Sequence, residues 1–264
     1  MIKNIKLFVN NNDEAMKNSL VIEKSFIKNG FSIVDKNFDL GIAVGGDGSF
    51  LRMVKSTNFD ENIKYVGVNS GHLGFLQDIT METLNDFIKE LIENKYKVDD
   101  INIQETNLYT KNSNHKYLSL NEIIIRDIQG KVVNLEVKIN DDLLEVYKGD
   151  GLMILTTCGS TAHNLSYGGS IVFNTLPTLQ ITSMAPINSK AYRSLINSVI
   201  VPKNYKIDII PTSDVNNYGI IVDGEYKCYE NIEKITTELN DRKIKCLRLS
   251  NYKYAKKIQD KLLS

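Results

Sequence analysis

A glycine-rich segment, Val44-Gly45-Gly46-Asp47-Gly48-Ser49-Phe50, constrains the fold of this chain more than any other stretch. The residues before it, Leu40–Val44, are mostly apolar, as is typical of a short buried strand in a parallel sheet. The residues after it, Ser49–Lys55, have the apolar spacing of a helix with a cap at Ser49. The pattern therefore predicts a turn from the carboxyl end of a strand into a helix. Backbone N–H groups there can face an anion, and glycine lets a phosphate come close.

Asp47 stands in the middle of this turn. A carboxylate repels phosphates, so its presence indicates catalysis or a metal rather than simple phosphate binding. The alternative interpretation is an ordinary Gly-Asp turn between a strand and a helix.

Two further segments carry a recognisable pattern. The pair Asn121-Glu122 precedes Ile123, and Asp150-Gly151-Leu152 is followed by a loop rich in Gly, Ser and Thr over residues 156–169. In this order the three motifs resemble the NAD kinase family, which has a Gly-Gly-Asp-Gly loop, an Asn-Glu pair and a Gly-Ser-Thr-Ala-Tyr segment. The resemblance runs from about Leu40 to Asp223. Lipid kinases and phosphofructokinases carry similar glycine loops, so the specific signal is the three motifs in order.

Composition limits the classes of function. The 264 residues include 32 basic and 32 acidic side chains, and this balance gives no basic footprint for nucleic acid. The three cysteines, Cys158, Cys228 and Cys246, are too far apart for a disulfide framework or a metal site, which favours a reducing cytoplasm. Lysines interrupt the apolar stretch Met1–Val9, so it is not a signal peptide. No apolar run approaches the length of a membrane span. We therefore expect a cytoplasmic protein without nucleic-acid or membrane partners.

Strands and helices alternate in the first part of the chain. The expected strands are Ile5–Val9, Phe31–Val34, Leu40–Val44 and Ile63–Val68. Asn12 and Thr80 are the expected caps of two helices that end at Gly30 and about Asn94. In the first of these, Met16, Leu20, Ile27 and their neighbours form the expected apolar stripe. Such alternation predicts a mostly parallel sheet, with ligands beyond the carboxyl ends of the strands, where Asp47 and the loop at residues 71–75 lie.

The pattern changes near Tyr96 to short β-rich segments separated by Asn-Asp and Gly turns, which predicts an all-β domain of sandwich type. The expected strands are Ile101–Tyr109, Tyr117–Ile125, Val132–Ile139, Leu152–Thr156, Ser198–Val201, Lys206–Ile210, Gly219–Val222, Ile232–Thr237 and Lys243–Leu249. One short helix, about Ser160 to Ser166, interrupts them. A last helix covers Asn251 to Leu263.

The resemblance adds the domain organisation. It implies an α/β plus all-β chain, with a Rossmann-like parallel-sheet domain at residues 1–97 and a β-sandwich NAD-binding domain at 98–249. The C-terminal helix, 250–264, is expected to pack back on the first domain.

For Asp47 the resemblance implies the catalytic role. It orients the adenosine ribose 2′-hydroxyl of NAD and accepts its proton during attack on a γ-phosphoryl group, a reaction that needs alignment more than covalent chemistry. Gly45, Gly46 and Gly48 then leave room for the donor phosphates.

The resemblance also implies a set of substrate contacts. Asn121 and Glu122 hold the ribose and amide edges of NAD, and the alternative is a polar strand end. Ser160, Thr161 and Ala162 read an adenine or phosphate edge, with Ser166 in the same segment, and the alternative is a plain helix cap. His163 stands where the family has tyrosine. It can stack on a purine but lacks the phenolic reach. Cys158 is expected to pack rather than react.

The resemblance implies six further contacts to the substrates. Asp150 is expected to contact the nicotinamide end, including across a subunit interface, and Lys148 to offset phosphate charge. Phe75, Ala185, Ile187 and Asp223 match family pocket positions. The alternatives are core packing for Phe75 and Ile187 and a turn role for Asp223.

The implied activity is that of an ATP- or polyphosphate-dependent NAD kinase that makes NADP and forms a homodimer or homotetramer. A divalent cation, Mg²⁺, bridges the donor phosphates without a dedicated protein cage, and His72 and His115 lack companion ligands. One alternative is a lipid kinase of the diacylglycerol or sphingosine type, which would need a route to membranes, but the chain has no basic amphipathic stretch. The other is a non-catalytic NAD(P) sensor, against which the intact Asp47 argues.

Overall fold

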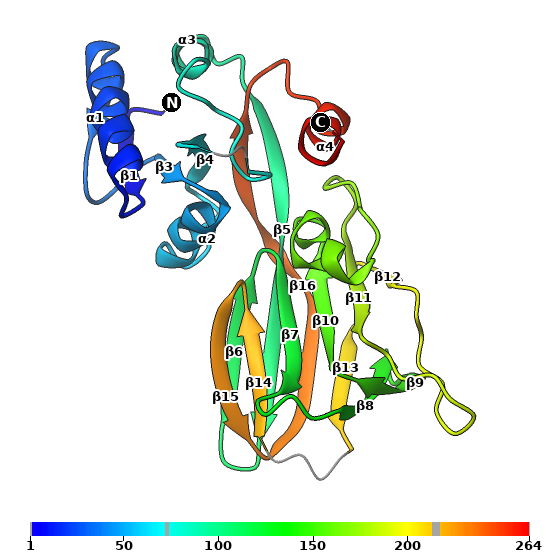
Figure 1. The fold of residues 1–264 in the computed structure, drawn as a ribbon. Coiled ribbons are helices and arrows are strands. Elements are labelled where there is room, and N and C mark those ends of the chain that lie inside the picture. Colours follow the sequence, from blue (N-terminus) through cyan, green and yellow to red (C-terminus); the bar gives the residue numbers. More distant parts are fainter. Residues whose placement is uncertain (1, 72–73, 213–216, 264) are drawn as a thin grey trace. The chain divides into compact units, whose positions relative to one another are not determined.

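The computed structural model describes residues 2–71, 74–212 and 217–263 (Figure 1). Two units make up the chain: Met1–Ile101 together with Lys243–Ser264, and Asn102–Arg242. The segment Lys243–Leu249, expected in the second domain, thus falls in the first unit. Strands β5 (Lys97–Thr110) and β16 (Ile232–Arg248) each contribute residues to both units.

The first unit is built on a parallel sheet, as predicted. Its strands are β1 (Asn4–Val9), β2 (Ser32–Ile33), β3 (Leu40–Gly45) and β4 (Lys64–Asn69), in the order β2-β1-β3-β4, followed by the end of β16. All pairings among them are parallel. Every residue of β3 is buried, which explains its nearly continuous apolar sequence.

Among the described residues of this unit, the helices are α1 (Asp13–Lys28), α2 (Asp47–Ser56), α3 (Leu84–Glu93) and α4 (Tyr254–Leu262). The Asn12 cap is confirmed, since its side chain accepts a hydrogen bond from the Ala15 N–H at 2.7 Å. Helix α2 begins two residues before the expected cap, with Gly46 at the N-cap position. Thr80 is not the cap of α3: it hydrogen-bonds Thr83, and the helix begins at Leu84.

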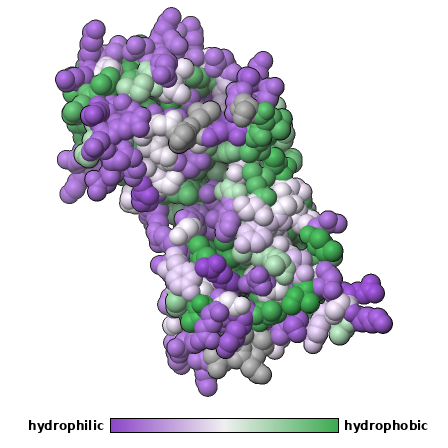
Figure 2. All heavy atoms as spheres, in the orientation of Figure 1, coloured by the Kyte–Doolittle hydropathy of each residue, from purple (hydrophilic) through white to green (hydrophobic). Residues whose placement is uncertain are grey.

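The buried face of α1 differs from the prediction. Met16, Leu20 and Ile27 are 45%, 58% and 53% exposed. Figure 2 shows hydrophobic residues among hydrophilic ones on the face of the molecule in view. Ala15, Ile22 and Phe26 are buried instead. Both sets have helical spacing and lie about 120° apart around the axis at 100° per residue. The sequence of α1 therefore contains two apolar stripes, and the one with Ala15, Ile22 and Phe26 is buried.

The second unit contains two antiparallel sheets. One has six strands in the order β12-β11-β10-β7-β14-β15. Their bounds are β7 (Glu122–Asp127), β10 (Gly151–Thr156), β11 (Thr178–Met184), β12 (Val199–Pro202), β14 (Asn217–Val222) and β15 (Glu225–Glu230). The other contains β16-β13-β8-β9 and the pair β5-β6, with β6 (Asn114–Ser119), β8 (Val133–Ile139), β9 (Asp142–Gly149) and β13 (Ile207–Pro211).

Residues from both sheets, such as Ile154 and Ile209, form one buried cluster, so this unit is the predicted sandwich. Three of its strands, β9, β11 and β15, were not predicted. The expected strand Tyr117–Ile125 is two strands, β6 and β7, interrupted at Leu120 and Asn121. The expected helix at 160–166 is a pair of 3₁₀ turns, η1 (Gly159–Thr161) and η2 (His163–Tyr167).

None of the helices in the described part of the chain combines the length and the apolar character needed to cross a lipid bilayer.

Candidate active site

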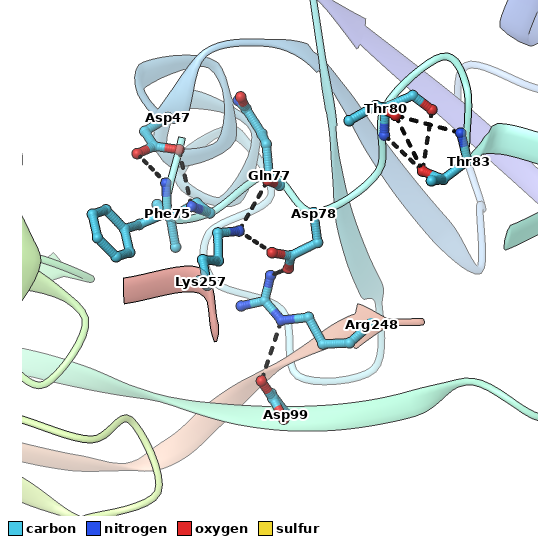
Figure 3. A network of polar contacts seen from close by, with 10 residues as sticks. Asp47, Phe75, Gln77, Asp78, Thr80, Thr83, Asp99, Arg248 and Lys257 are labelled. Carbon is cyan, nitrogen blue, oxygen red and sulfur yellow. Dashed lines mark hydrogen bonds and ion pairs between the residues drawn. The ribbon is translucent and has the colours of Figure 1, made fainter. Parts of the chain in front are cut away.

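Asp47 is held by a loop from elsewhere in the first unit (Figure 3). As the first residue of α2, it lies where the helix dipole favours a negative charge. The Phe75 N–H donates to Oδ2 at 2.8 Å, and the Leu76 N–H donates to Oδ1 at 2.9 Å. A Cβ atom at Gly74 would overlap the carboxylate, so only glycine fits there. The carboxylate is therefore fixed in position through both oxygens.

The glycines around Asp47 differ in what surrounds them. Gly45 has φ of 149° and packs against Ser49, with no space for a side chain. A Cβ atom at Gly46 would meet nothing within 4 Å, and one at Gly48 would meet only the Arg52 guanidinium, at 3.4 Å. Gly46 and Gly48 are exposed. The space over the start of α2 is thus open to an anion, as the prediction for donor phosphates requires.

Asp223 shapes the Asn-Glu segment in the second unit. It lies with Gly224 in the turn between β14 and β15, where φ is 47° and 82°, as in a tight hairpin. Its Oδ1 accepts hydrogen bonds from the N–H groups of Asn121 (2.7 Å) and Glu122 (3.2 Å). Its Oδ2 accepts one from the Leu120 N–H at 2.8 Å. Asp223 therefore orders the backbone at the start of β7, in addition to the turn role considered above.

Glu122 is a buried acid at the start of β7. The residue is 5% exposed, and its Oε2 has no hydrogen-bond partner among the described residues. Burial, together with the negative charge of Asp223, raises the pKa of Glu122 to about 8. A protonated carboxyl group at neutral pH can both donate and accept a hydrogen bond.

The Gly-Ser-Thr loop packs against Asn121. A Cβ atom at Gly159 would overlap the Asn121 backbone, which explains the glycine. Ser160 is fully buried, and its Oγ lies within hydrogen-bond distance of Thr157 O (2.7 Å) and both backbone polar atoms of Val172. Ser160 therefore holds the backbone of this loop, and its hydroxyl does not cap a helix.

Asn164, which the sequence did not single out, organises the same loop. It is fully buried, and its Oδ1 accepts hydrogen bonds from Gln180 Nε2 and Thr182 Oγ1, both at 2.7 Å. Its amide nitrogen donates to Ser160 O at 3.0 Å and to Ser170 O at 3.2 Å. The only signal for it in the sequence is its place between the Gly-Ser-Thr segment and the Gly168-Gly169 pair.

The remaining residues of this loop are more accessible. His163 and Ser166 are exposed, while Thr161 and Ala162 are half-buried. The His163 ring lies edge-on to Tyr167, with 5.3 Å between the ring centroids. The imidazole is thus available to a ligand, as the prediction requires.

Lys148, Asp150, Ala185 and Ile187 form a second cluster. The Ile187 N–H donates to Lys148 O at 2.8 Å, and the Asp150 N–H donates to Met184 O at 3.0 Å. The Lys148 ammonium lies 3.7 Å from the centroid of the Tyr192 ring. Ala185 is exposed, with φ of 46°.

The two clusters of the second unit lie at opposite ends of β10. Gly151, at its start, pairs with Met184, whereas the N–H of Thr156, at its end, donates to Asn121 O at 2.9 Å. Five residue steps of strand span about 17 Å. The structure therefore does not bring Lys148 and Asp150 together with Asn121 and Ser160.

Phe75 and the two other histidines are the remaining residues considered in the sequence. Phe75 is half-buried and belongs to the first unit. His72 lies outside the described residues. His115 contacts Ser113 Oγ at 2.8 Å and lies near Tyr229. Among the residues that the structure describes, no group of three or more His, Cys, Asp or Glu side chains could hold a metal ion.

Comparisons with known proteins agree with this arrangement. Family models described as ATP-NAD kinase N-terminal domain and ATP-NAD kinase C-terminal domain match residues 7–96 and 120–243. The chain is 35% identical over 269 residues to an NAD kinase of Finegoldia magna, with 99% of this chain and 98% of that protein covered. This chain belongs to the NAD kinase family. An NAD kinase of Leuconostoc mesenteroides is 30% identical over 254 residues, covering 94% of this chain and 95% of that protein.

Solved structures of the NAD kinase type share the fold. A yeast NADH kinase complexed with NADH matches with a TM-score of 0.84 at 20% identity, covering 99% of this chain and 87% of that one. An NAD kinase from Archaeoglobus fulgidus in complex with ATP matches with a TM-score of 0.74 at 20% identity, covering 99% and 98%. The family predicted from the three motifs is confirmed, and with it the kinase class of enzyme.

Proposed function

We propose that this chain transfers the γ-phosphoryl group of ATP to the adenosine ribose 2′-hydroxyl of NAD, giving NADP and ADP. Membership of the NAD kinase family supports this activity. The observation that carries it is the Asp47 carboxylate, fixed by the Phe75 and Leu76 N–H groups at the amino end of α2. A non-catalytic sensor would have no need for a carboxylate held beside an open phosphate-binding loop.

Asp47 acts as the general base in this proposal. Each of its oxygens accepts one backbone N–H, which leaves a further lone pair on each oxygen for the substrate hydroxyl. As the 2′-oxygen forms a bond to the γ-phosphorus, the bond from that phosphorus to the β-γ bridging oxygen breaks, and the hydroxyl proton passes to Asp47. The fixed carboxylate supplies the alignment on which phosphoryl transfer depends.

The contacts to NAD are assigned to the second unit. Asn121 and Glu122 hold the ribose and amide edges, and the protonated Glu122 can donate to an acceptor on the substrate. His163 stacks on the adenine, with Thr161, Ala162 and Ser166 around it. Ser160 and Asp223 contribute by holding the backbone of this region.

The donor side is assigned to the glycine loop. Gly45, Gly46 and Gly48 make room for the phosphates of ATP or polyphosphate. The residues present are compatible with a Mg²⁺ ion that is bound mainly by groups other than protein side chains. Because the described residues offer no cluster of metal ligands, donor phosphates and water would hold the ion, as is usual for this metal. It would neutralise the charge of the donor phosphates.

A second copy of the chain is part of this proposal. Lys148, Asp150, Ala185 and Ile187 lie at the far end of β10 from the Asn121 cluster, which supports a role toward the substrate of another copy in a homodimer or homotetramer. A cytoplasmic location is supported by the cysteine pattern of the sequence, three widely separated residues without the spacing of a disulfide framework.

The test is a coupled assay with NAD, ATP and magnesium, in which an NADP-specific dehydrogenase reports the product. We expect NADP to form with ATP, and a parallel reaction with polyphosphate measures the second donor. Diacylglycerol and sphingosine serve as alternative acceptors. Phosphorylation of a lipid without NADP formation, or NAD binding without turnover, would contradict the proposal.

A further inference from the structure

We propose that Lys257, on the C-terminal helix α4, is a positioning residue for Asp47. It acts through the loop that binds the Asp47 carboxylate, so the last helix of the chain controls the geometry of the general base. This inference rests on the proposed function for its kinetic consequence, while its structural consequence can be measured separately.

The loop at residues 75–78 has no regular secondary structure, yet it carries both N–H groups that bind Asp47. Toward its end it is tied to β4, where the Asn69 N–H donates to Ile79 O at 2.7 Å and Ile79 bridges Val68. Between these two attachments lie Gln77 and Asp78. Leu76 and Gln77 are buried, and an irregular loop of this kind also takes its position from the polar groups around it.

Lys257 supplies that attachment (Figure 3). Its ammonium donates to Gln77 O at 2.9 Å across 180 positions of sequence, and it forms an ion pair with the Asp78 carboxylate. Arg248 forms a second ion pair with Asp78, and its Nε lies 3.2 Å from Asp99 Oδ2. Two cations and two carboxylates thus hold the segment that directly follows Phe75 and Leu76.

The network is buried, which makes it rigid. The side chains of Arg248, Asp78 and Lys257 are 3%, 5% and 6% exposed. A buried charge that loses its partner is strongly unfavourable, so each member restrains the others. Burial lowers the pKa of Arg248, and the charge of Asp47 is among those that oppose this shift. Asp47 is therefore within electrostatic reach of the same network.

The consequence concerns turnover more than binding. If Gln77 and Asp78 lose their attachment, the N–H groups of the two preceding residues are no longer held on Asp47. A misplacement of about 1 Å at a catalytic group can lower the rate by about 10²-fold. Such a change lowers kcat without a matching change in substrate affinity.

The experiment compares Lys257→Met with Lys256→Met. Lys256 is the adjacent residue, its side chain is 62% exposed and it forms an ion pair with Asp260, so it is the matched control. We expect Lys257→Met to lower kcat about 10- to 100-fold with KM for NAD nearly unchanged, Lys257→Arg to restore most of it, and Lys256→Met to behave as wild type. Amide hydrogen exchange at Phe75 and Leu76 should accelerate in Lys257→Met alone.

A double variant separates positioning from general destabilisation. If Lys257 acts through Asp47, adding Lys257→Met to Asp47→Asn should cost little further activity, because the two effects are not additive. Full multiplication of the two losses would overturn the proposal, and so would wild-type kcat and wild-type exchange in Lys257→Met. If Lys257→Met does not fold, Lys257→Gln decides by the same readouts. Failure of the wild-type chain to make NADP would instead contradict the proposed function, and the exchange measurement would still test Lys257.

Discussion

At the scale of single residues, the site depends on groups that fix a side chain rather than on the side chain alone. The Asp47 carboxylate is bound by two backbone N–H groups that its own helix does not supply. Gly74 leaves the space that this contact needs. In the second unit the Asp223 carboxylate accepts hydrogen bonds from the N–H groups of Asn121 and Glu122 and so holds that backbone in place. Residues that position others are thus as informative about this site as the residues expected to react.

His163 carries a prediction at this scale. Its exposed ring stands where the family has tyrosine, and we expect it to stack on the adenine of NAD. His163→Ala should weaken NAD binding by about 1–3 kcal/mol, if stacking of bases on aromatic side chains is a guide, while His163→Tyr should retain it. Calorimetry with NAD measures both variants. Unchanged affinity in His163→Ala would remove the residue from the pocket.

The sequence singles out candidate chemistry-bearing residues, but it does not reveal the groups that hold them in place. Asp47 is found from the sequence because the apolar run before it and the helical spacing after it predict a glycine turn at the end of a strand. The contact from Phe75 joins positions 28 apart, and it uses a backbone group that the side-chain identity does not reveal. Ser160 reads as a ligand from its hydroxyl, yet its surroundings in the fold bury it. Long-range contacts of this kind have no local signature.

At the scale of elements, prediction succeeded where one pattern dominated. The buried strand β3 and the parallel order around it follow from apolar runs and alternation. Helix α1 carried two apolar stripes, and only packing against the sheet decides between them. Strands β9 and β15 contain exposed residues, and β11 is almost entirely buried but rich in polar residues, so the apolar pattern of all three is weak. These strands are identified by their hydrogen-bonded pairing with β8, β10 and β14 in the structure.

The start of β7 gives a pH-dependent prediction. The pKa of Glu122 is raised to about 8 from 4.5, so the folded state holds this proton more tightly than the unfolded state does. Its contribution to stability is therefore complete below pH 4.5 and is lost as pH rises to about 8. Glu122→Gln cannot lose a proton. The difference in the free energy of unfolding between Glu122→Gln and wild type should therefore shift between pH 4 and pH 9. At pH 9 the variant should be more stable relative to wild type than at pH 4, by on the order of a few kcal/mol.

Urea unfolding of the ligand-free protein at the two pH values measures this difference. Glu230→Gln, an exposed acid on β15 of the same unit, is the matched control and should show no such pH-dependent gain. Parallel pH profiles for wild type and Glu122→Gln would contradict the assignment of a buried, protonated Glu122.

At the scale of the whole molecule, the chain returns to its first unit at its end. Residues 243–264 belong with residues 1–101, and their Arg248 and Lys257 side chains hold the loop that binds Asp47. The return of the last helix was predicted by the family resemblance, whereas its ion pairs were not. Most of the residues expected to bind NAD are in the other unit. The proposed function therefore draws on residues of both units.

The central claim is that Asp47 is the general base of an NAD kinase, and Asp47→Asn tests it most directly. Asparagine keeps the size of the side chain but cannot accept the proton of the 2′-hydroxyl. A positioned general base typically contributes about 10²–10⁴ in rate. NAD affinity is measured by calorimetry, and NADP formation is measured with saturating ATP and magnesium. We predict a folded variant that binds NAD within a few-fold of wild type and makes NADP at least ~100-fold more slowly. Near-normal turnover in Asp47→Asn would contradict the claim and leave the segment as a structural Gly-Asp turn.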